Sequence, residues 1–178
     1  MAIVKLAHRP ELPGKLYRVD ILIETLPEPL TPKKVKAIEG CLWRLQDKYP
    51  HMSWFIAPSK TDSQTARKRS VKEDKQGRPA GMVEGEPVAL HIHMGMMGTA
   101  ERSACSVVRE FIGKTKKSLG EGVGIQSWPT KDSTHAWDFI AYAHRQGEYF
   151  HQGRKKEKDG KPAQYDFKSA EDVRFYGL

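Results

Sequence analysis

The chain has 178 residues and a mass of 20.2 kDa, with 38% hydrophobic residues and a mean hydropathy of −0.64. These values fit one polar domain with its own core, and no apolar run approaches the roughly 18 residues that a membrane span needs. Lys and Arg number 30 against 22 Asp and Glu, a formal charge of +8, so we expect a polyanionic partner, nucleic acid before an acidic membrane surface.

The first half of the chain predicts a strand, a helix and a second strand. Residues 16–25 alternate and are rich in branched side chains, which favours a strand. A helix is predicted from Pro32, with Thr31 as its N-cap and apolar residues at helical spacing. Residues 52–58 predict the second strand. The polar stretch 59–80 carries seven Lys or Arg against three Asp or Glu, so we expect a long basic insertion loop.

The second half predicts a strand, a helix, a strand and a final helix. The third strand runs through "LHIHM", residues 90–94, after a turn of Gly and Pro. A helix is predicted over 99–119 and a short strand over 122–128. The last helix is predicted over 133–150, with Ser133 as its N-cap.

This order of elements favours an α+β fold with a ferredoxin-like (split βαβ) antiparallel sheet, two helices on one face and a later tyrosine-bearing helix. We assign residues 1–153 to one domain and residues 154–178 to a charged loop and a C-terminal segment that docks back onto it. The N-terminus lacks the features of a secretory signal. Cys41 and Cys105 lie in predicted helices without C-x-x-C spacing, which favours a reducing compartment.

Two histidines on the third strand are the first candidate site residues. Because side chains alternate along a strand, His91 and His93 point to the same face, about 6–7 Å apart. Two imidazoles at this spacing can bind one divalent ion, or they can simply pack on an open sheet face. A hairpin at Gly85–Pro87 would bring Glu84 alongside them, and a carboxylate with two histidines suits Mg²⁺ or Mn²⁺.

The final helix supplies the candidate nucleophile. Tyr142, Arg145 and Gln146 share one helical face, and Tyr149 is expected to project similarly two turns further on. A tyrosine hydroxyl is a poor nucleophile at neutral pH because its pKa is about 10. A neighbouring metal ion and a cation would make its attack on a phosphate feasible. The alternative is that Tyr142 is an amphipathic packing residue.

With these residues the chain resembles the HUH endonuclease superfamily, the replication-initiator (Rep) and relaxase proteins that nick single-stranded DNA. The family name describes His-hydrophobic-His, which here is His91-Ile92-His93. The family's nickase domain has a ferredoxin-like sheet with this pair on a central strand. In parvovirus-type Rep domains a Glu stands seven residues before the first His, which would make Glu84 the third metal ligand.

The tyrosine motifs of the superfamily can be matched in two ways. In viral Rep proteins the motif is Y-x-x-K, which would be Tyr142 with Arg145 in the place of Lys. In single-tyrosine insertion-sequence transposases it is Y-x-x-x-Q, which would be Tyr142 with Gln146 as the third ligand. Tyr149 is the alternative nucleophile.

The resemblance implies nicking and joining of single-stranded DNA, or of an origin hairpin, through a 5′-phosphotyrosine that starts rolling-circle replication of a plasmid, phage or virus. It implies bound Mg²⁺ or Mn²⁺, no membrane, and a host helicase or polymerase, or a second copy of the chain, as partners. A transposase or relaxase would share this chemistry, and a ferredoxin-like sheet can also bind single strands without chemistry. Residues expected to contact DNA phosphates are Arg67, Lys68, Arg69, Lys72, Arg154, Lys155 and Lys156.

Three tryptophans, Trp54, Trp128 and Trp137, are expected in the core. Trp128 is also placed beside Pro129 at a strand end, where it could stack an unpaired base.

Overall fold

The computed structural model describes residues 11–61, 67–68, 82–83, 87–98, 104–154, 160 and 164–168. None of the helices within these ranges has the length and apolar character to cross a membrane. The elements, in chain order, are β1 (Leu16–Ile21), a 3-10 helix (Ile23–Thr25), α1 (Pro32–Lys48), β2 (Ser53–Thr61), β3 (Arg67–Lys68), β4 (Met82–Val83), β5 (Pro87–Met97), α2 (Ala104–Leu119), β6 (Ile125–Pro129), α3 (Ser133–Gln146) and β7 (His151–Gln152).

The main sheet has five strands in the order β6-β1-β5-β2-β7, and each neighbouring pair is antiparallel. α1 joins β1 to β2, which lie on either side of β5, and α2 joins β5 to β6, which lie on either side of β1. The predicted α+β class and antiparallel sheet are confirmed. β5 occupies the centre of the sheet, so the histidine strand is paired on both edges.

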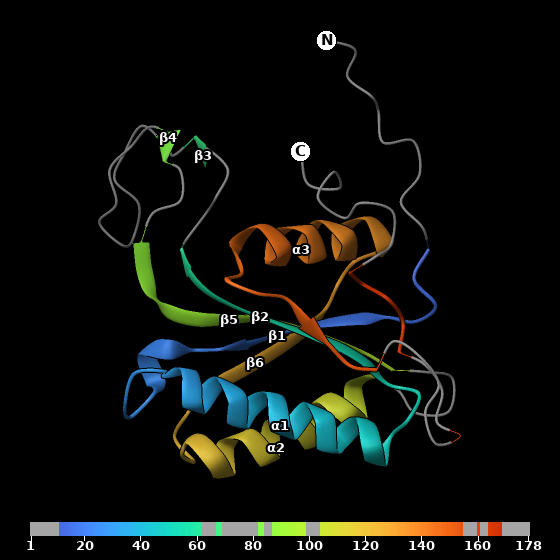
Figure 1. Ribbon diagram of the computed structural model, residues 1–178, viewed down its shortest axis with the longest axis horizontal. Coiled ribbons are helices and arrows are strands. Elements are labelled where there is room, and N and C mark those ends of the chain that lie inside the picture. The colour runs from blue at the N-terminus through green and yellow to red at the C-terminus, as the bar shows by residue number, and fades with distance from the viewer. Residues whose placement is uncertain are drawn as a thin grey trace.

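The sheet is covered on both faces, as Figure 1 shows: α1 and α2 lie together on one side and α3 on the other. A buried apolar cluster fills each of the two spaces. The cluster under α1 and α2 includes Val19, Leu42, Ile56, Met94 and Phe111. The cluster under α3 includes Leu16, Phe55, Trp137, Ile140, Phe150 and Phe167.

The ends of α1 and α3 follow from their capping residues. The side chain of Thr31 accepts a hydrogen bond from Lys34 N at 3.3 Å, which confirms it as the N-cap of α1. The predicted cap of α3 is wrong: Asp132 accepts from His135 N at 2.9 Å. Ser133 is the first helical residue, and its hydroxyl accepts from Leu12 N instead.

The last helix is shorter than predicted. α3 ends at Gln146, and Gly147 follows with extended backbone and donates its N–H to Ala143 O. Glu148 N then donates to Pro58 O of β2 at 2.8 Å, which turns the chain toward the edge of the sheet. Tyr149 therefore lies beyond the helix and does not continue its face, contrary to the prediction.

The basic insertion predicted over 59–80 is partly regular structure. Ser59 and Thr61 belong to β2, which continues three residues past Pro58. Residues 67–68 form β3 and pair with β4 in a separate two-stranded ladder. The remaining residues of this insertion lie outside the described ranges.

The described part of the C-terminal segment packs into the domain. Gln164 is buried, and its Oε1 accepts hydrogen bonds from Trp54 N and Gly153 N. Phe167 is fully buried, and its ring meets Phe55 at 5.3 Å between centroids. Residues 164–168 thus complete the core under α3, as expected of a segment that docks back.

Candidate active site

The two histidines point from β5 toward α3. Strand alternation turns Ile92 and Met94 into the core under α1 and α2, where both are buried. His91 and His93 therefore occupy the opposite face, and their rings meet at 4.9 Å between centroids with an interplanar angle of 88°. The shared face predicted for the pair is what the fold produces.

The hydrogen bond of His91 fixes which of its nitrogens is available. Its Nδ1 lies 2.9 Å from the carbonyl oxygen of Ala89. Because a carbonyl can only accept, Nδ1 carries the proton and donates, which leaves the lone pair on Nε2. A histidine that ligates a metal is commonly oriented by this kind of bond through its second nitrogen.

His93 is a buried imidazole with only 5% of its surface exposed. Burial, the neighbouring His91 and the charge of Arg18 lower its pKa to about 3. The ring is therefore neutral at physiological pH, as a metal ligand must be. Its Nε2 is buried and has no hydrogen-bond partner among the described residues. A buried nitrogen of this kind is costly unless something binds it, so this donor set fits a divalent cation.

α3 brings a tyrosine to the same face as the histidines. The ring of Tyr142 meets the ring of His93 edge to face, with centroids 5.1 Å apart and an interplanar angle of 80°. Phe139, one turn earlier, is buried, and the centre of its ring lies 6.4 Å from the centre of the same imidazole. Helical spacing thus aligns the tyrosine with the histidine pair. Had Tyr142 lain on the other face of the sheet, it could not serve this pair.

Gln146 lies one turn after Tyr142 on α3. It is 2% exposed, and its Oε1 accepts a hydrogen bond from Thr61 Oγ1 of β2 at 2.7 Å. Arg145 is partly buried on the same helix. Ser59, two residues before Thr61, is paired in register with His91. The amide oxygen of Gln146 is therefore held by Thr61 of β2, the strand that pairs with the histidine strand β5.

The two candidates for a third metal ligand are Glu84 and Gln146. Glu84, the predicted carboxylate, lies outside the described residues. Within the described ranges no group of three or more His, Cys, Asp or Glu side chains is arranged to hold a metal ion. His91 and His93 are thus two of the ligands such a site would need, and Glu84 and Gln146 both stay predictions.

Tyr149, the alternative nucleophile, has different surroundings from Tyr142. Its ring packs on His151 of β7, with centroids 4.3 Å apart. Burial, followed by the charges of Glu39 and Glu148, raises its pKa above the ordinary value of 10.0. A raised pKa makes the phenolate of Tyr149 harder to form, and its ring packs on β7, whereas the ring of Tyr142 packs on His93.

The structure bears on few of the predicted phosphate contacts. Arg154 is mostly buried and forms an ion pair with Asp47 of α1, which reduces the charge that it can offer to DNA. Arg67 and Lys68 form β3, whereas Arg69, Lys72, Lys155 and Lys156 lie outside the described residues.

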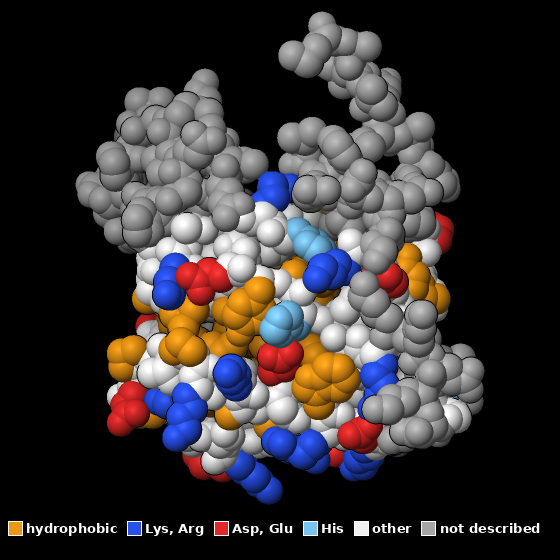
Figure 2. Space-filling view, viewed as in Figure 1, with side chains coloured by type: hydrophobic (Ala, Val, Ile, Leu, Met, Phe, Trp, Pro, Cys, Tyr) orange, Lys and Arg blue, Asp and Glu red, His pale blue; other side chains and the backbone are white. Residues whose placement is uncertain are grey.

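A basic groove lies on the other side of the molecule, between α1 and α2. Its volume is about 540 Å³, and its lining includes Lys36, Arg44, Lys114 and Lys117. Figure 2 shows Lys and Arg side chains along the α1 and α2 side, with acidic side chains between them. This groove faces away from the histidines and so is separate from the candidate site.

The open part of the α3 face holds two residues beside the site. Trp54 and Trp137 are fully buried as predicted, but Trp128 is 39% exposed, so its assignment to the core is wrong. Arg18 lies opposite Trp128 in the sheet and contacts its ring. Sequence reasoning missed Arg18, although the alternation of "LYRVDI" puts Arg18 and Asp20 on the face opposite Val19.

Comparison of the chain with protein-family models, with curated proteins and with solved structures finds no match. A function therefore has to be inferred from the histidine pair, from the helix that crosses it and from the surface around them.

Proposed function

We propose that the chain is a metal-dependent endonuclease of the HUH type, which nicks and rejoins single-stranded DNA through Tyr142. The observation that carries the proposal is the contact between Tyr142 and His93, at 5.1 Å between ring centroids, beside a second histidine at 4.9 Å. A nucleophile and two imidazoles on one sheet face are components that such a reaction requires.

The connectivity of the sheet supports this proposal. The strand order β6-β1-β5-β2 with antiparallel neighbours, together with the connections through α1 and α2, is the arrangement expected of a ferredoxin-like split βαβ fold. In the HUH superfamily the histidine pair stands on a central strand and the tyrosine on a later helix. β5 and α3 correspond to these two elements.

His91 and His93 would hold Mg²⁺ or Mn²⁺, with Glu84 or Gln146 as the third ligand. His93 Nε2 has no hydrogen-bond partner in the described part of the chain, and the Nδ1–H bond of His91 leaves a lone pair on its Nε2, so each ring can offer a nitrogen to a cation. Imidazole ligands suit Mn²⁺ better than the harder Mg²⁺. When bound, the cation would supply charge that polarises the scissile phosphate.

Tyr142 would then carry the covalent step. Its phenolic oxygen loses a proton and forms a bond to phosphorus, while the bond from phosphorus to the 3′ oxygen breaks. The leaving oxygen takes up a proton and becomes a 3′-OH, and the DNA stays attached as a 5′-phosphotyrosine. Attack by another 3′-OH reverses the step, so joining needs no ATP. Arg145, three residues further on the helix, would stabilise the developing negative charge.

The free 3′ end can prime synthesis, which is the basis for proposing initiation of rolling-circle replication. Such a protein would act in the cytoplasm of a bacterial or archaeal host, or in the nucleus for a eukaryotic virus. One observation favours a second candidate: buried Gln146 stands four residues after Tyr142, as in single-tyrosine transposases. The chemistry is the same in both cases.

The test is the formation of a covalent protein–DNA adduct. The protein is incubated with labelled single strands and Mn²⁺, and the products are separated under denaturing conditions. An adduct is expected for the natural chain and for Tyr149→Phe, and none for Tyr142→Phe, which keeps the ring and removes only the hydroxyl. An adduct that persists in Tyr142→Phe would refute the proposed nucleophile. Binding without any Mn²⁺-dependent cleavage would favour a non-catalytic module.

A further inference from the structure

In the described part of the chain, the sheet face next to the histidine pair is open toward its β6 edge. α3 packs on β2 and β5, whereas β6 is an edge strand of the sheet. Trp128 projects from β6 on the α3 face and keeps 39% of its surface exposed. Most exposed hydrophobic residues need no explanation, but an indole beside a candidate nuclease site is a surface on which a base can stack.

Trp128 is held by a neighbouring side chain. It pairs in register with Arg18 of β1, whose guanidinium lies 5.2 Å from the centre of the indole and 4.8 Å from the ring of Phe139. The Arg18 side chain is in turn fixed by Asp20, through Nε to Oδ1 at 3.2 Å and NH2 to Oδ2 at 3.3 Å. These contacts give the indole a preferred orientation before any ligand arrives.

The ion pair with Asp20 determines what kind of ligand suits this surface. The carboxylate of Asp20 offsets the charge of Arg18. A ligand therefore meets the flat indole and guanidinium groups and little net charge. A phosphate would meet the oxygens of Asp20 and be repelled, whereas an uncharged, flat nucleobase can stack on the indole. The surface therefore favours the base of a nucleotide over its phosphate.

The distance to the histidines matches a short stretch of DNA. Trp128 pairs with Arg18, and Arg18 pairs with Gly95, two residues from His93. Two strand spacings of about 4.8 Å and two residues at about 3.3 Å put the Cα atoms of Trp128 and His93 roughly 12 Å apart. At the roughly 3.4 Å repeat of a stacked strand, that span is covered by about four nucleotides.

We infer that Trp128, backed by Arg18, is a stacking site for one unpaired base of the single-stranded DNA substrate, within about four nucleotides of the phosphate that Tyr142 attacks. This inference rests on the proposed function for the identity of the substrate. It adds which side of the sheet the strand crosses and what fixes its position there.

Binding of a fluorescent oligodeoxynucleotide, followed by anisotropy in EDTA so that no cleavage occurs, tests the inference. Trp128→Ala should weaken binding about 5- to 100-fold, the loss expected for one stacked base, and Trp128→Phe should retain most of the affinity. The dependence of affinity on salt should keep its slope, because no phosphate contact is lost. A Trp128→Ala protein that binds as tightly as the natural chain, or one whose salt slope falls by about one phosphate, would overturn the inference.

An oligonucleotide series with one abasic site per molecule locates the base. An abasic site at one position should weaken binding to the natural chain. The same abasic site should not weaken binding to Trp128→Ala, because the stacking contact is already absent in that variant. An equal loss of affinity in both proteins at every abasic position would reject the stacking site. Equally tight, Trp128-dependent binding of the matching RNA would reject the assignment of this site to DNA. If binding depends on Trp128 but no cleavage is found, the stacking site stands and the nuclease proposal fails. If the natural chain cleaves DNA but Trp128→Ala binds it equally well, the nuclease proposal stands and the stacking site fails.

Discussion

The ring of Tyr142 on α3 stands edge to face against the ring of His93 on β5, with centroids 5.1 Å apart. The two residues are 49 positions apart in the sequence, and α2 and β6 intervene between their elements. Their contact exists because α3 crosses back over the face of β5 that α1 and α2 leave uncovered (Figure 1).

Loss of either histidine should abolish tight binding of Mn²⁺. His91→Ala and His93→Ala are each expected to weaken Mn²⁺ binding by at least about 10- to 100-fold, because each removes a ligand rather than a residue that only orients one. Electron paramagnetic resonance of free Mn²⁺ in titrations measures this directly. His151→Ala is the matched control, since His151 is an exposed histidine on β7 paired with Glu39 at 2.9 Å. Undiminished Mn²⁺ binding in both His91→Ala and His93→Ala would refute the proposed metal site.

The buried imidazole of His93 should lower the stability of the metal-free protein relative to an apolar side chain at this position. Its Nε2 is buried without a partner among the described residues, so His93→Leu should raise the free energy of unfolding of the metal-free protein by about 1 kcal/mol. His91→Leu should bring no such gain, because His91 is partly exposed and its Nδ1 bonds Ala89 O. Urea unfolding in EDTA gives both values. A less stable His93→Leu protein would mean that the imidazole is satisfied in the apo state.

Alternation and helical spacing were sufficient to predict much of this arrangement. The period of two on β5 predicted the shared face of His91 and His93, and the Thr31-Pro32 pair predicted the N-cap and the first residue of α1. The end of α3 was missed although Gly147, a common helix-terminating residue, directly follows Gln146; the bond from Glu148 N to Pro58 O of β2 then turns the chain toward the sheet edge. Such a contact is tertiary and leaves no local pattern.

Pattern alone left both a core position and an exposed stacking position open for Trp128, and the exposed one is observed. A tryptophan in a strand is usually buried, and the sequence does not specify how much of the sheet α3 covers. Arg18 reaches the ring of Trp128 only because β1 pairs with β6, which joins residues more than a hundred positions apart. Sequence pattern therefore predicted the shared face of the two histidines better than the surface around Trp128 and Arg18.

A side chain at position 95 should disrupt the core beneath the site. A Cβ on Gly95 would lie 2.3 Å from Cε1 of Phe55. That ring cannot easily move, because it packs on Phe139, Phe150 and Phe167 at 5.0–5.6 Å between centroids. Gly95→Ala is therefore expected to lower the free energy of unfolding by about 1–3 kcal/mol, the usual cost of overpacking.

Gly113 provides the opposite case for the same substitution. It lies on the exposed side of α2, and a Cβ there would meet nothing within 4 Å. Gly113→Ala should stabilise the protein by about 0.5–1 kcal/mol through helix propensity. Urea unfolding of the two variants side by side gives the comparison, and a tolerated Gly95→Ala would show that the ring of Phe55 can shift.

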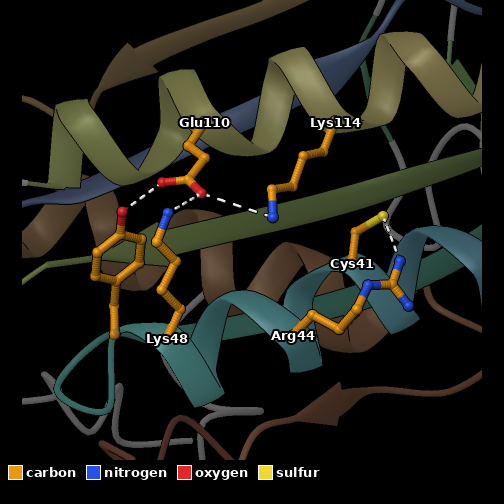
Figure 3. A network of polar contacts seen from close by, with 6 residues as sticks. Cys41, Arg44, Lys48, Glu110 and Lys114 are labelled. Atoms are coloured by element: carbon orange, nitrogen blue, oxygen red, sulfur yellow. Dashed lines mark hydrogen bonds and ion pairs between the residues drawn. The ribbon is translucent and has the colours of Figure 1, made fainter.

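The polar link between α1 and α2 should make stability depend on pH. Glu110 accepts hydrogen bonds from Lys48 Nζ at 2.6 Å and from the hydroxyl of Tyr49, with Lys114 Nζ at 3.6 Å (Figure 3). These groups, Lys48 first, lower the pKa of Glu110 below its ordinary value of 4.5. The unfolded chain therefore takes up this proton before the folded protein does as the pH falls.

It follows that the contribution of Glu110 is complete above pH 4.5 and is lost as the pH falls through the lower pKa of the folded protein. Glu110→Gln should reduce the free energy of unfolding by about 1 kcal/mol at neutral pH, a modest value because solvent screens the network, and by much less near pH ~3. Urea unfolding at both pH values measures the difference. Glu28→Gln is the control, because that carboxylate is largely exposed in its pair with Lys34 and its loss should change stability by less than about 0.5 kcal/mol at either pH. An equal loss for Glu110→Gln at both pH values would mean that side-chain shape, and not the ionised carboxylate, links the two helices.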